Sequence, residues 1–326
     1  METTVATTRN FNGIYASTVC PLQANGAIDE QSLDRHLRTV LEGTGMRGLL
    51  LNGHAGENAM LGRAEQRRVI EIGRRIGRDH LIVAGVNAES SDVAALLARD
   101  AAEAGADAVM VFAPFSWALG ADERVIVEHH RLVQEATALP MFLFQGSVNA
   151  GRLAFSPSVL RSLLSLRSVV GIKEGSWETS AYDAVRRLTK AIRPDVAVMA
   201  SGDEHLFTCF VLGSEGSLVS LAAVVPELIV ALDRAVTDGD LAGARVLHDR
   251  IYPLAKAIYG TAPGSLATAR LKACLKLLGR LERATCRAPV GDLPAEEYER
   301  LSLALAEAGL RTDKSAGKPA LALNTA

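Results

Sequence analysis

The chain has 326 residues, 48% of them hydrophobic, with 35 basic and 37 acidic side chains. This length and composition suffice for a large folded core and exclude a disordered chain. The near-neutral charge gives no electrostatic reason to expect nucleic acid or an anionic membrane as a partner.

The cysteine pattern bears on the compartment and on metal binding. No pair of cysteines has the C-x-x-C spacing of a metal or redox motif. The sequence shows neither a signal peptide nor an apolar stretch long enough to cross a bilayer, so we expect reduced thiols in a cytoplasmic protein. The adjacent pair His129-His130 lies in a polar helical stretch, and we expect no zinc or iron site. The four cysteines are Cys20, Cys209, Cys274 and Cys286.

The first predicted elements follow a polar, threonine-rich segment, residues 1–11, which we expect to be a flexible N-terminus. Short apolar runs, typical of buried parallel strands, then alternate with amphipathic runs that glycine often ends. Strands are predicted at Gly13–Val19, Gly48–Leu51, Leu81–Ala84, Ala108–Phe112, Met141–Phe144, Val169–Lys173, Val196–Ala200 and Ser217–Leu221. Helices predicted between them include Asp29–Leu41, Ala64–Ile76, Ser91–Ala104, Asp122–Ala136 and Thr179–Ala191.

Eight strands, each followed by a helix, indicate an α/β fold of the (β/α)8 TIM barrel type over residues 12–237. An open doubly wound sheet is the competing fold, but the first strand runs into Cys20-Pro21-Leu22 rather than into a glycine-rich phosphate loop. The remaining sequence predicts a C-terminal helical domain over 238–311 and a loose tail over 312–326. Its helices are expected at Leu241–Tyr259, Ser265–Leu278 and Ala295–Ala308.

Lys173 ends the apolar run that begins at Val169. Burial of an ammonium group favours the neutral amine and lowers its pKa from ~10.4. A neutral, positioned amine can attack a ketone. A lysine whose ammonium group reaches back to solvent is the alternative, and the position of Lys173 among other polar strand ends favours the Schiff-base interpretation.

Polar and glycine-rich residues follow five of the predicted strands, at the end of a barrel where catalysis takes place. The turn from Gly53 to Glu57 is expected to direct backbone N–H groups toward a carboxylate. Glu57 is expected to hold that turn through hydrogen bonds rather than to take part in the reaction. The strand-end segments are Asn52–Glu57, Ala113–Trp117, Phe144–Ser147, Lys173–Ser176 and Ser201–Asp203.

The sequence resembles the dihydrodipicolinate synthase and N-acetylneuraminate lyase family of class I aldolases, from Gly13 to about Leu310. The resemblance depends on seven segments that occur in order with family-like spacing. They are Gly13 to Thr18 with Pro21 and Gly26-Ala27-Ile28-Asp29, Gly53-x-x-Gly56-Glu57, Ala113-Pro114-Phe115, Pro140 to Phe144, Gly171-Ile172-Lys173-Glu174, Ser201-Gly202-Asp203, and Gly213-Ser214-Glu215-Gly216-Ser217 with Pro226.

The resemblance implies that Lys173 forms a Schiff base with a 2-oxo acid such as pyruvate. It also implies a homotetramer built as a dimer of dimers. Chemistry of this kind uses the protonated imine as its electron sink, so we expect no metal and no organic cofactor. The residues expected to line the substrate site are Gly53, Ala55, Ser116, Phe144, Ser147 and Gly202.

The sequence departs from these relatives at the proton-transfer positions. Relatives carry a tyrosine at the end of the fifth strand, where this chain has Phe144. The partners of that tyrosine correspond to His54 and Ser116, and the arginine that binds the second substrate in the synthases corresponds to Asn149. Arg152 is a candidate substitute for it. Authentic dihydrodipicolinate synthesis is therefore not expected.

His54 is the predicted acid–base residue, because imidazole titrates near neutrality and Phe144 has no proton to give. A histidine that only holds the loop or the bound carboxylate is the alternative. Phe115 and Trp117 are expected to pack in the core or at a subunit interface.

The expected function is that of a lyase for pyruvate or a hydroxylated 2-oxo acid, acting by aldol cleavage, aldol addition or dehydration. A keto-acid-binding sensor without turnover is one alternative. A phosphate-binding barrel that uses the glycines around Gly202 and Gly213–Gly216 is another.

Overall fold

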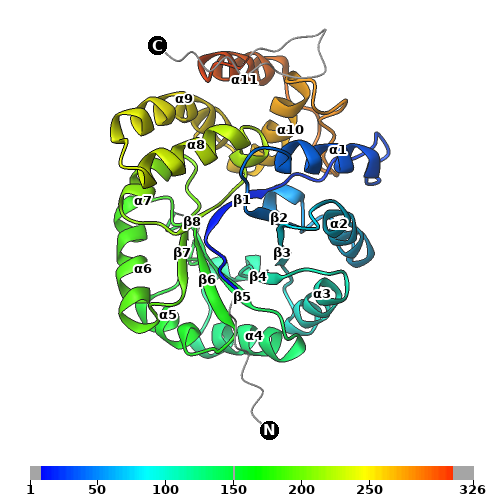
Figure 1. Cartoon of the computed structure of the whole chain (residues 1–326). Helices are drawn as coiled ribbons and strands as arrows, with labels where there is room; N and C mark the ends of the chain where they lie inside the picture. Colours follow the sequence, from blue (N-terminus) through cyan, green and yellow to red (C-terminus); the bar gives the residue numbers. More distant parts are fainter. Residues whose placement is uncertain (1–8, 150, 311–326) are drawn as a thin grey trace.

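The computed structural model describes residues 9–149 and 151–310. In these residues eight parallel strands close into a barrel in chain order. The strands are β1 (Gly13–Ser17), β2 (Gly48–Leu51), β3 (Leu81–Val86), β4 (Ala108–Val111), β5 (Met141–Gln145), β6 (Val169–Glu174), β7 (Ala197–Ala200) and β8 (Gly216–Val219). Figure 1 shows them as the inner ring. The predicted (β/α)8 barrel is confirmed.

Helices follow the strands and form the outer ring (Figure 1). Capping side chains begin several of them: the Asp29 carboxylate accepts the Ser32 N–H of α1 at 3.0 Å, and Pro157 opens α5 after the cap Ser156. The helices are α1 (Glu30–Leu41), α2 (Arg63–Ile76), α3 (Ser91–Glu103), α4 (Glu123–Ala136), α5 (Pro157–Leu164), α6 (Thr179–Ile192), α7 (Leu206–Val211) and α8 (Pro226–Thr237). No helix in the described ranges is long and apolar enough to cross a membrane.

The barrel interior is filled by apolar side chains from alternate strand positions, as expected for a packed core rather than a pore. Phe11 closes the end where the strands begin, with its ring in an edge-on contact 5.5 Å from Phe142. At the other end Lys173 pairs in register with Phe144 on β5 and Met199 on β7. Residues opposite each other on neighbouring parallel strands face the same side, so Lys173 points into the barrel mouth.

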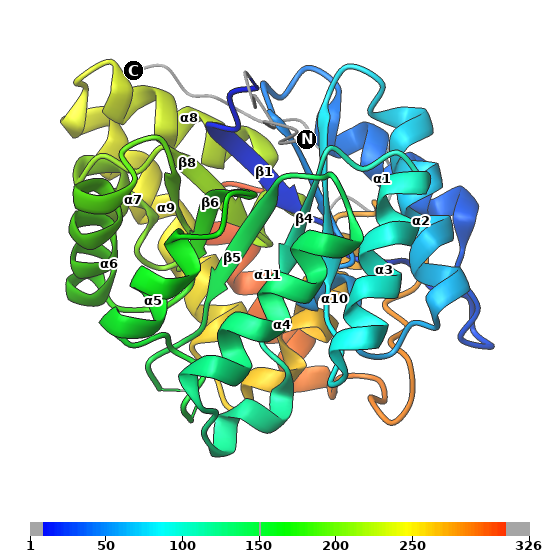
Figure 2. The ribbon, with the colours of Figure 1, turned by 90° about the horizontal axis from the view of Figure 1, so that it is seen from below.

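The C-terminal region consists of α9 (Leu241–Tyr259), the 3₁₀ turn η4 (Gly264–Leu266), α10 (Ala267–Leu277) and α11 (Ala295–Glu307). Figure 2, a side view, shows α10 and α11 at one end of the barrel. It is the end where the strands finish, since α10 packs on η1 (His54–Gly56), the 3₁₀ turn that follows β2. The helical region therefore covers the barrel mouth.

The eight predicted strands all occur, and each observed end lies within two residues of the predicted one. The three C-terminal helices also occur, and η4 takes the first residues of the predicted second helix. The expected flexible segment 1–11 falls mainly, and the expected tail 312–326 entirely, outside the described residues.

Candidate active site

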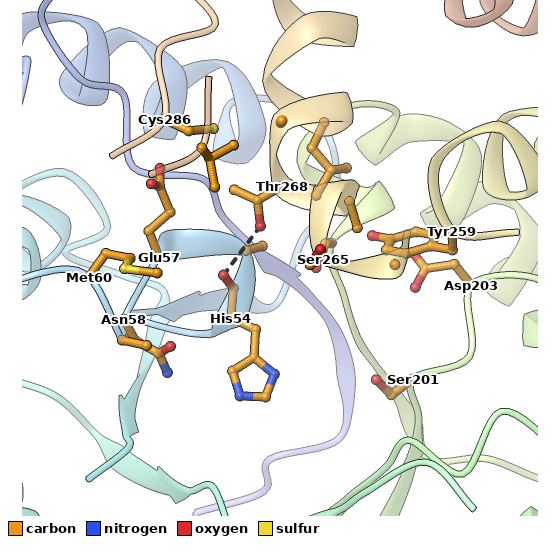
Figure 3. A pocket seen from close by; sticks show the side chains of 18 of the residues that line it. His54, Glu57, Asn58, Met60, Ser201, Asp203, Tyr259, Ser265, Thr268 and Cys286 are labelled. Atoms are coloured by element: carbon orange, nitrogen blue, oxygen red, sulfur yellow. Dashed lines mark hydrogen bonds between the residues drawn. The ribbon is translucent and has the colours of Figure 1, made fainter. Parts of the chain in front are cut away.

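A cavity of about 420 Å³ lies where the barrel mouth meets α10 (Figure 3). Both the barrel and the C-terminal helices contribute to its wall. Its polar and aromatic lining includes His54, Phe115, Phe144, Lys173, Trp177, Ser201, Asp203, Ser220, Tyr259, Ser265 and Thr268.

Lys173 reaches the cavity from β6 and is only 7% exposed. Its Nζ atom lies 5.6 Å from the centre of the Phe144 ring. Burial lowers the pKa of Lys173 to about 8, and the carboxylate of Asp203 opposes part of that shift. A lysine with this pKa has a usable fraction of neutral amine near pH 7, as nucleophilic attack on a carbonyl requires.

His54 lies among three aromatic rings, one of which is that of Phe144. Its ring centre is 4.4 Å from that of Phe112, 5.7 Å from Phe115 in a stacked arrangement, and 5.5 Å edge-on from Phe144. His54 lines the cavity and is among the solvent-exposed residues. Loss of water lowers the pKa of His54 well below its usual value, and the charge on Lys173 lowers it further. The imidazole is therefore neutral at pH 7, and it titrates below the near-neutral range that the sequence suggested.

The predicted turn from Gly53 to Glu57 contains the 3₁₀ turn η1, with Gly53 and Glu57 flanking it. Its later N–H groups are used within the turn, since Gly56 N–H donates to Gly53 and Glu57 N–H donates to His54. The first N–H groups of a helical turn have no partner inside it, so those of His54 and Ala55 are positioned to bind an anion. Ala55 lines the cavity, and Gly53 lies just behind it with no room for a side chain, because a Cβ there would approach the Ser17 hydroxyl to 2.9 Å.

Glu57 holds this turn against the C-terminal region, as the sequence analysis expects. Its carboxylate forms an ion pair with Lys272 of α10, which has no exposed side-chain surface, and accepts the Arg287 N–H at 2.8 Å. Lys272 also donates to the Thr285 carbonyl at 2.8 Å. These contacts join one wall of the cavity to the other.

The barrel mouth also carries backbone strain. In the described residues, the non-glycine residues with positive φ are Asn52 (52°), Glu57 (59°) and Trp177 (64°), and all three follow β2 or β6. Glu57 and Trp177 line the cavity. Conformations of this kind cost free energy and concentrate where a site must be held in one shape.

Besides Gly53, three of the expected substrate-binding residues, Ser116, Ser147 and Gly202, are not on the cavity wall. The N–H groups of Phe115 and Ser116 donate to the Glu89 carboxylate, at 2.8 and 3.3 Å. The Ser147 hydroxyl accepts the Asn149 N–H at 3.1 Å. Gly202 lies next to Trp177 and His205. Phe144 and Ala55, by contrast, are on the wall.

The candidate arginine substitute does not reach the site. Arg152 packs on Gly120, and its N–H donates to the Ala118 carbonyl at 3.1 Å. It lines a separate surface hollow with Leu119 and Ile126. Asn149 is exposed and is not part of the cavity wall.

The phosphate-binding alternative needs correction. Gly213 lies before β8 and Gly216 begins it, at the end of the barrel opposite Gly202, so these glycines cannot form one phosphate site. His129 and His130 lie in α4 and are buried; His129 Nδ1 lies 2.9 Å from the Ser91 hydroxyl. The described residues contain no cluster of three or more His, Cys, Asp or Glu placed to hold a metal.

Two further residues line the cavity: Asp203, which lies in a predicted motif without a predicted role, and Tyr259, which the sequence patterns do not place there. Asp203 follows β7 and is 3% exposed; its Oδ1 atom accepts the Leu221 N–H at 2.9 Å. Burial raises the pKa of Asp203 to about 7, against the lowering effects of that hydrogen bond and of Lys173. Tyr259 ends α9, outside the barrel. A barrel motif predicts Asp203 at the mouth, whereas only the packing of α9 brings Tyr259 there.

The chain is thus a closed (β/α)8 barrel with a buried lysine at its mouth. The family model described as "Dihydrodipicolinate synthetase family" matches residues 10–308. The chain belongs to this family.

Individual relatives are distant but cover most of the chain. The 4-hydroxy-tetrahydrodipicolinate synthase of Methanothrix thermoacetophila is 31% identical over 76% of this chain and 82% of its own. The "Probable 2-dehydro-3-deoxy-D-pentonate aldolase YjhH" of Escherichia coli is 25% identical over 93% of this chain and 99% of its own. The crystal structure of dihydrodipicolinate synthase from Thermotoga maritima superimposes with a TM-score of 0.84 at 25% identity, covering 92% of this chain and 99% of that one.

Proposed function

We propose that the protein is a Schiff-base-forming lyase that acts on pyruvate or a hydroxylated 2-oxo acid. The observation that carries this proposal is Lys173, a buried lysine with a lowered pKa that points into the barrel mouth. His54 and Ala55, the first residues of η1, line the same cavity, and their N–H groups are the proposed partners of the substrate carboxylate.

In this reaction Nζ of Lys173 attacks the C2 ketone, and loss of water gives a protonated imine. The imine withdraws electrons from C3, so that a C3–C4 bond breaks or forms, or a hydroxyl leaves after proton loss at C3. His54 is the proposed proton carrier for this second stage. It lies within 5.5 Å of Phe144, which in turn contacts Lys173, and its neutral imidazole can accept a proton.

The cavity favours a lyase for another 2-oxo acid over an authentic dihydrodipicolinate synthase. Phe144 offers no phenol, and neither Asn149 nor Arg152 reaches the cavity to bind a second carboxylate. The relative YjhH is named as an aldolase for a 2-dehydro-3-deoxy-pentonate, which is a hydroxylated 2-oxo acid. The cavity of this chain, at about 420 Å³, has room for a substrate longer than pyruvate.

A keto-acid sensor without turnover is the second candidate, and the apolar ring of Phe144 is the observation that favours it. Such a protein would form the imine at Lys173 and release the acid unchanged. Turnover with a panel of 2-oxo acids separates the two functions.

We also propose that copies of this chain assemble, through apolar side chains beside the site. Leu119 is 89% exposed and Phe115 is 50% exposed, both on the 3₁₀ turn η2 (Phe115–Leu119). One structural relative at 25% identity is a monomeric dihydrodipicolinate synthase variant, so assembly is not uniform among relatives. Light scattering on the purified protein tests for the expected tetramer.

The central experiment treats the protein with borohydride and single 2-oxo acids, followed by intact-mass measurement. A reduced adduct on the peptide that contains Lys173 is the expected result, and Lys173→Ala should abolish it. Failure of every acid to label the native protein, or labelling that persists in Lys173→Ala, would overturn the proposal.

A further inference from the structure

The site contains a buried carboxyl group that the reaction above does not use. Asp203 follows β7 and lines the same cavity as Lys173. One oxygen, Oδ1, is held by the Leu221 N–H at 2.9 Å. A hydrogen bond from the backbone N–H of Asp203 itself and the charge on Lys173 also favour its carboxylate form. A buried carboxyl that is held by the backbone in the wall of the cavity is placed to exchange a proton with a ligand.

Tyr259 covers this carboxyl from the C-terminal region. Figure 3 shows its ring beside Asp203, apart from His54. The ring packs 5.2 Å from Trp177, and the buried hydroxyl has no hydrogen-bond partner in the described part of the chain. Burial, aided by the nearby Asp203, raises the pKa of Tyr259 well above its usual value. The phenol therefore keeps its proton and can position a hydroxyl or a water, but it is not a base.

Two proton tasks arise in Schiff-base catalysis, and they occur at different atoms. One concerns the oxygen that leaves C2 when the imine forms, close to Nζ of Lys173. The other concerns C3, or the group beyond it, when a bond breaks. His54 follows β2 and Asp203 follows β7, and both line the cavity, so a single residue need not serve both tasks.

We propose that Asp203 is the catalytic acid–base for forming and hydrolysing the imine at Lys173, with Tyr259 as its positioning residue. This inference rests on the proposed Schiff-base function. Attack of the neutral amine on C2 and transfer of one N–H proton to the carbonyl oxygen give a carbinolamine. Asp203 then donates its proton to that hydroxyl, the C–O bond breaks, water leaves and the C=N bond forms. Product release reverses these steps, and the water that adds to C2 returns a proton to Asp203.

The charges around Asp203 favour this cycle. Lys173 from β6 stabilises its carboxylate, whereas Glu204, its chain neighbour, destabilises it. Tyr259 from α9 carries no charge, and His54, also on the cavity wall, is neutral at pH 7. The pKa values of Asp203 and Lys173, about 7 and about 8, keep a shared proton available near neutral pH.

The test measures the rate of imine formation as a function of pH. The protein is mixed with pyruvate, the reaction is stopped with borohydride at set times, and the reduced adduct is quantified by intact-mass measurement. The native protein should give a bell-shaped profile with limbs near pH 7 and 8. In Asp203→Asn the rate should fall by at least about 100-fold, the lower end of the ~10²–10⁴-fold that acid–base groups contribute. The alkaline limb should disappear, because only the neutral amine of Lys173 then limits the rate.

Companion variants separate chemistry from folding. Asp203→Glu retains a carboxyl and should keep the alkaline limb at a reduced rate. Tyr259→Phe should slow imine formation and leave the bell intact, and Tyr252→Phe on the exposed face of the same helix is its matched control. Asp233→Asn changes a partly buried carboxyl of α8 outside the cavity and should leave the profile unaltered.

The outcomes distinguish the two proposals. No adduct with the native protein refutes the Schiff-base function itself. Normal labelling of the native protein, together with an unchanged rate and an unchanged bell in Asp203→Asn, refutes the role of Asp203 alone. If circular dichroism shows that Asp203→Asn is unfolded, Asp203→Glu becomes the test variant. Loss of the alkaline limb in Asp203→Glu, despite the retained carboxyl, would also overturn the inference.

Discussion

The Nζ atom of Lys173 lies 5.6 Å from the centre of the Phe144 ring, and the two residues are paired in register on neighbouring strands. The same ring meets the edge of His54 at 5.5 Å. Phe144 therefore forms an apolar partition between the nucleophile and the imidazole. It helps to exclude water from both groups, in keeping with the lowered pKa of each.

Replacement of His54 tests the second proton step. His54→Ala should lower kcat by at least about 100-fold, because general acid–base groups contribute ~10²–10⁴-fold, and should leave imine formation at Lys173 detectable. The pKa of His54 is lowered in the folded protein, so its neutral form should be lost only as pH falls well below the ordinary value of ~6.5. The acid limb of kcat against pH should lie in that lower range. A near-native kcat with a raised KM would make His54 a binding residue.

Phe144→Tyr should rescue the His54→Ala variant. The new phenol would stand between Lys173 and the vacated imidazole position and supply the missing proton. We expect kcat to recover at least about tenfold, on the scale of partial acid–base catalysis. Phe112→Tyr is the matched control, because it adds a hydroxyl to a second ring that packs against His54. Equal rescue by both substitutions would show that any nearby hydroxyl suffices and would contradict a specific role for position 144.

Synthesis of dihydrodipicolinate from pyruvate and aspartate semialdehyde should be weak or absent. Phe144 lacks the phenol, and Arg152 packs on Gly120 outside the cavity. A coupled assay at neutral pH with the purified protein measures this directly. Efficient synthase turnover would show that the departures at Phe144 and Asn149 do not matter.

The buried ion pair between Glu57 and Lys272 should be needed for stability. Lys272→Met leaves the Glu57 carboxylate buried with only the Arg287 N–H as a partner, and removal of one member of such a pair costs about 3–5 kcal/mol. The double variant Glu57→Gln with Lys272→Met should lose less than the sum of the single variants, because no charge remains unpaired. Denaturant unfolding measures these differences, and strict additivity would contradict the coupling.

The sequence predicted the barrel well because each strand is a short apolar run between amphipathic helices. It placed Lys173 at the mouth for the same reason, since a residue at the end of a parallel strand can lie only at that rim. The pairing of strands repeats regularly, so local patterns were sufficient for the fold.

Contacts between distant segments were the part that sequence could not predict. Tyr259 and Thr268 belong to helices that follow the barrel in the chain, and no periodic pattern indicates which helix end meets the mouth. The pKa of His54 was likewise misjudged, because the three rings that surround it come from separate loops and strands. His129-His130 looked polar in sequence, yet helix packing buries both.

The Glu57–Lys272 pair fastens the turn that faces the substrate carboxylate to the helix that forms the far wall. The barrel strands end at Val219 in the chain, and α10 begins only at Ala267. The barrel half and the helical half of the cavity therefore come from separate stretches of the sequence. Mutations in the α10 stretch can reshape the distal half while the lysine and its strand stay untouched. Exchange of the α10 segment can then change the substrate preference, provided that the new segment retains a cation that pairs with Glu57.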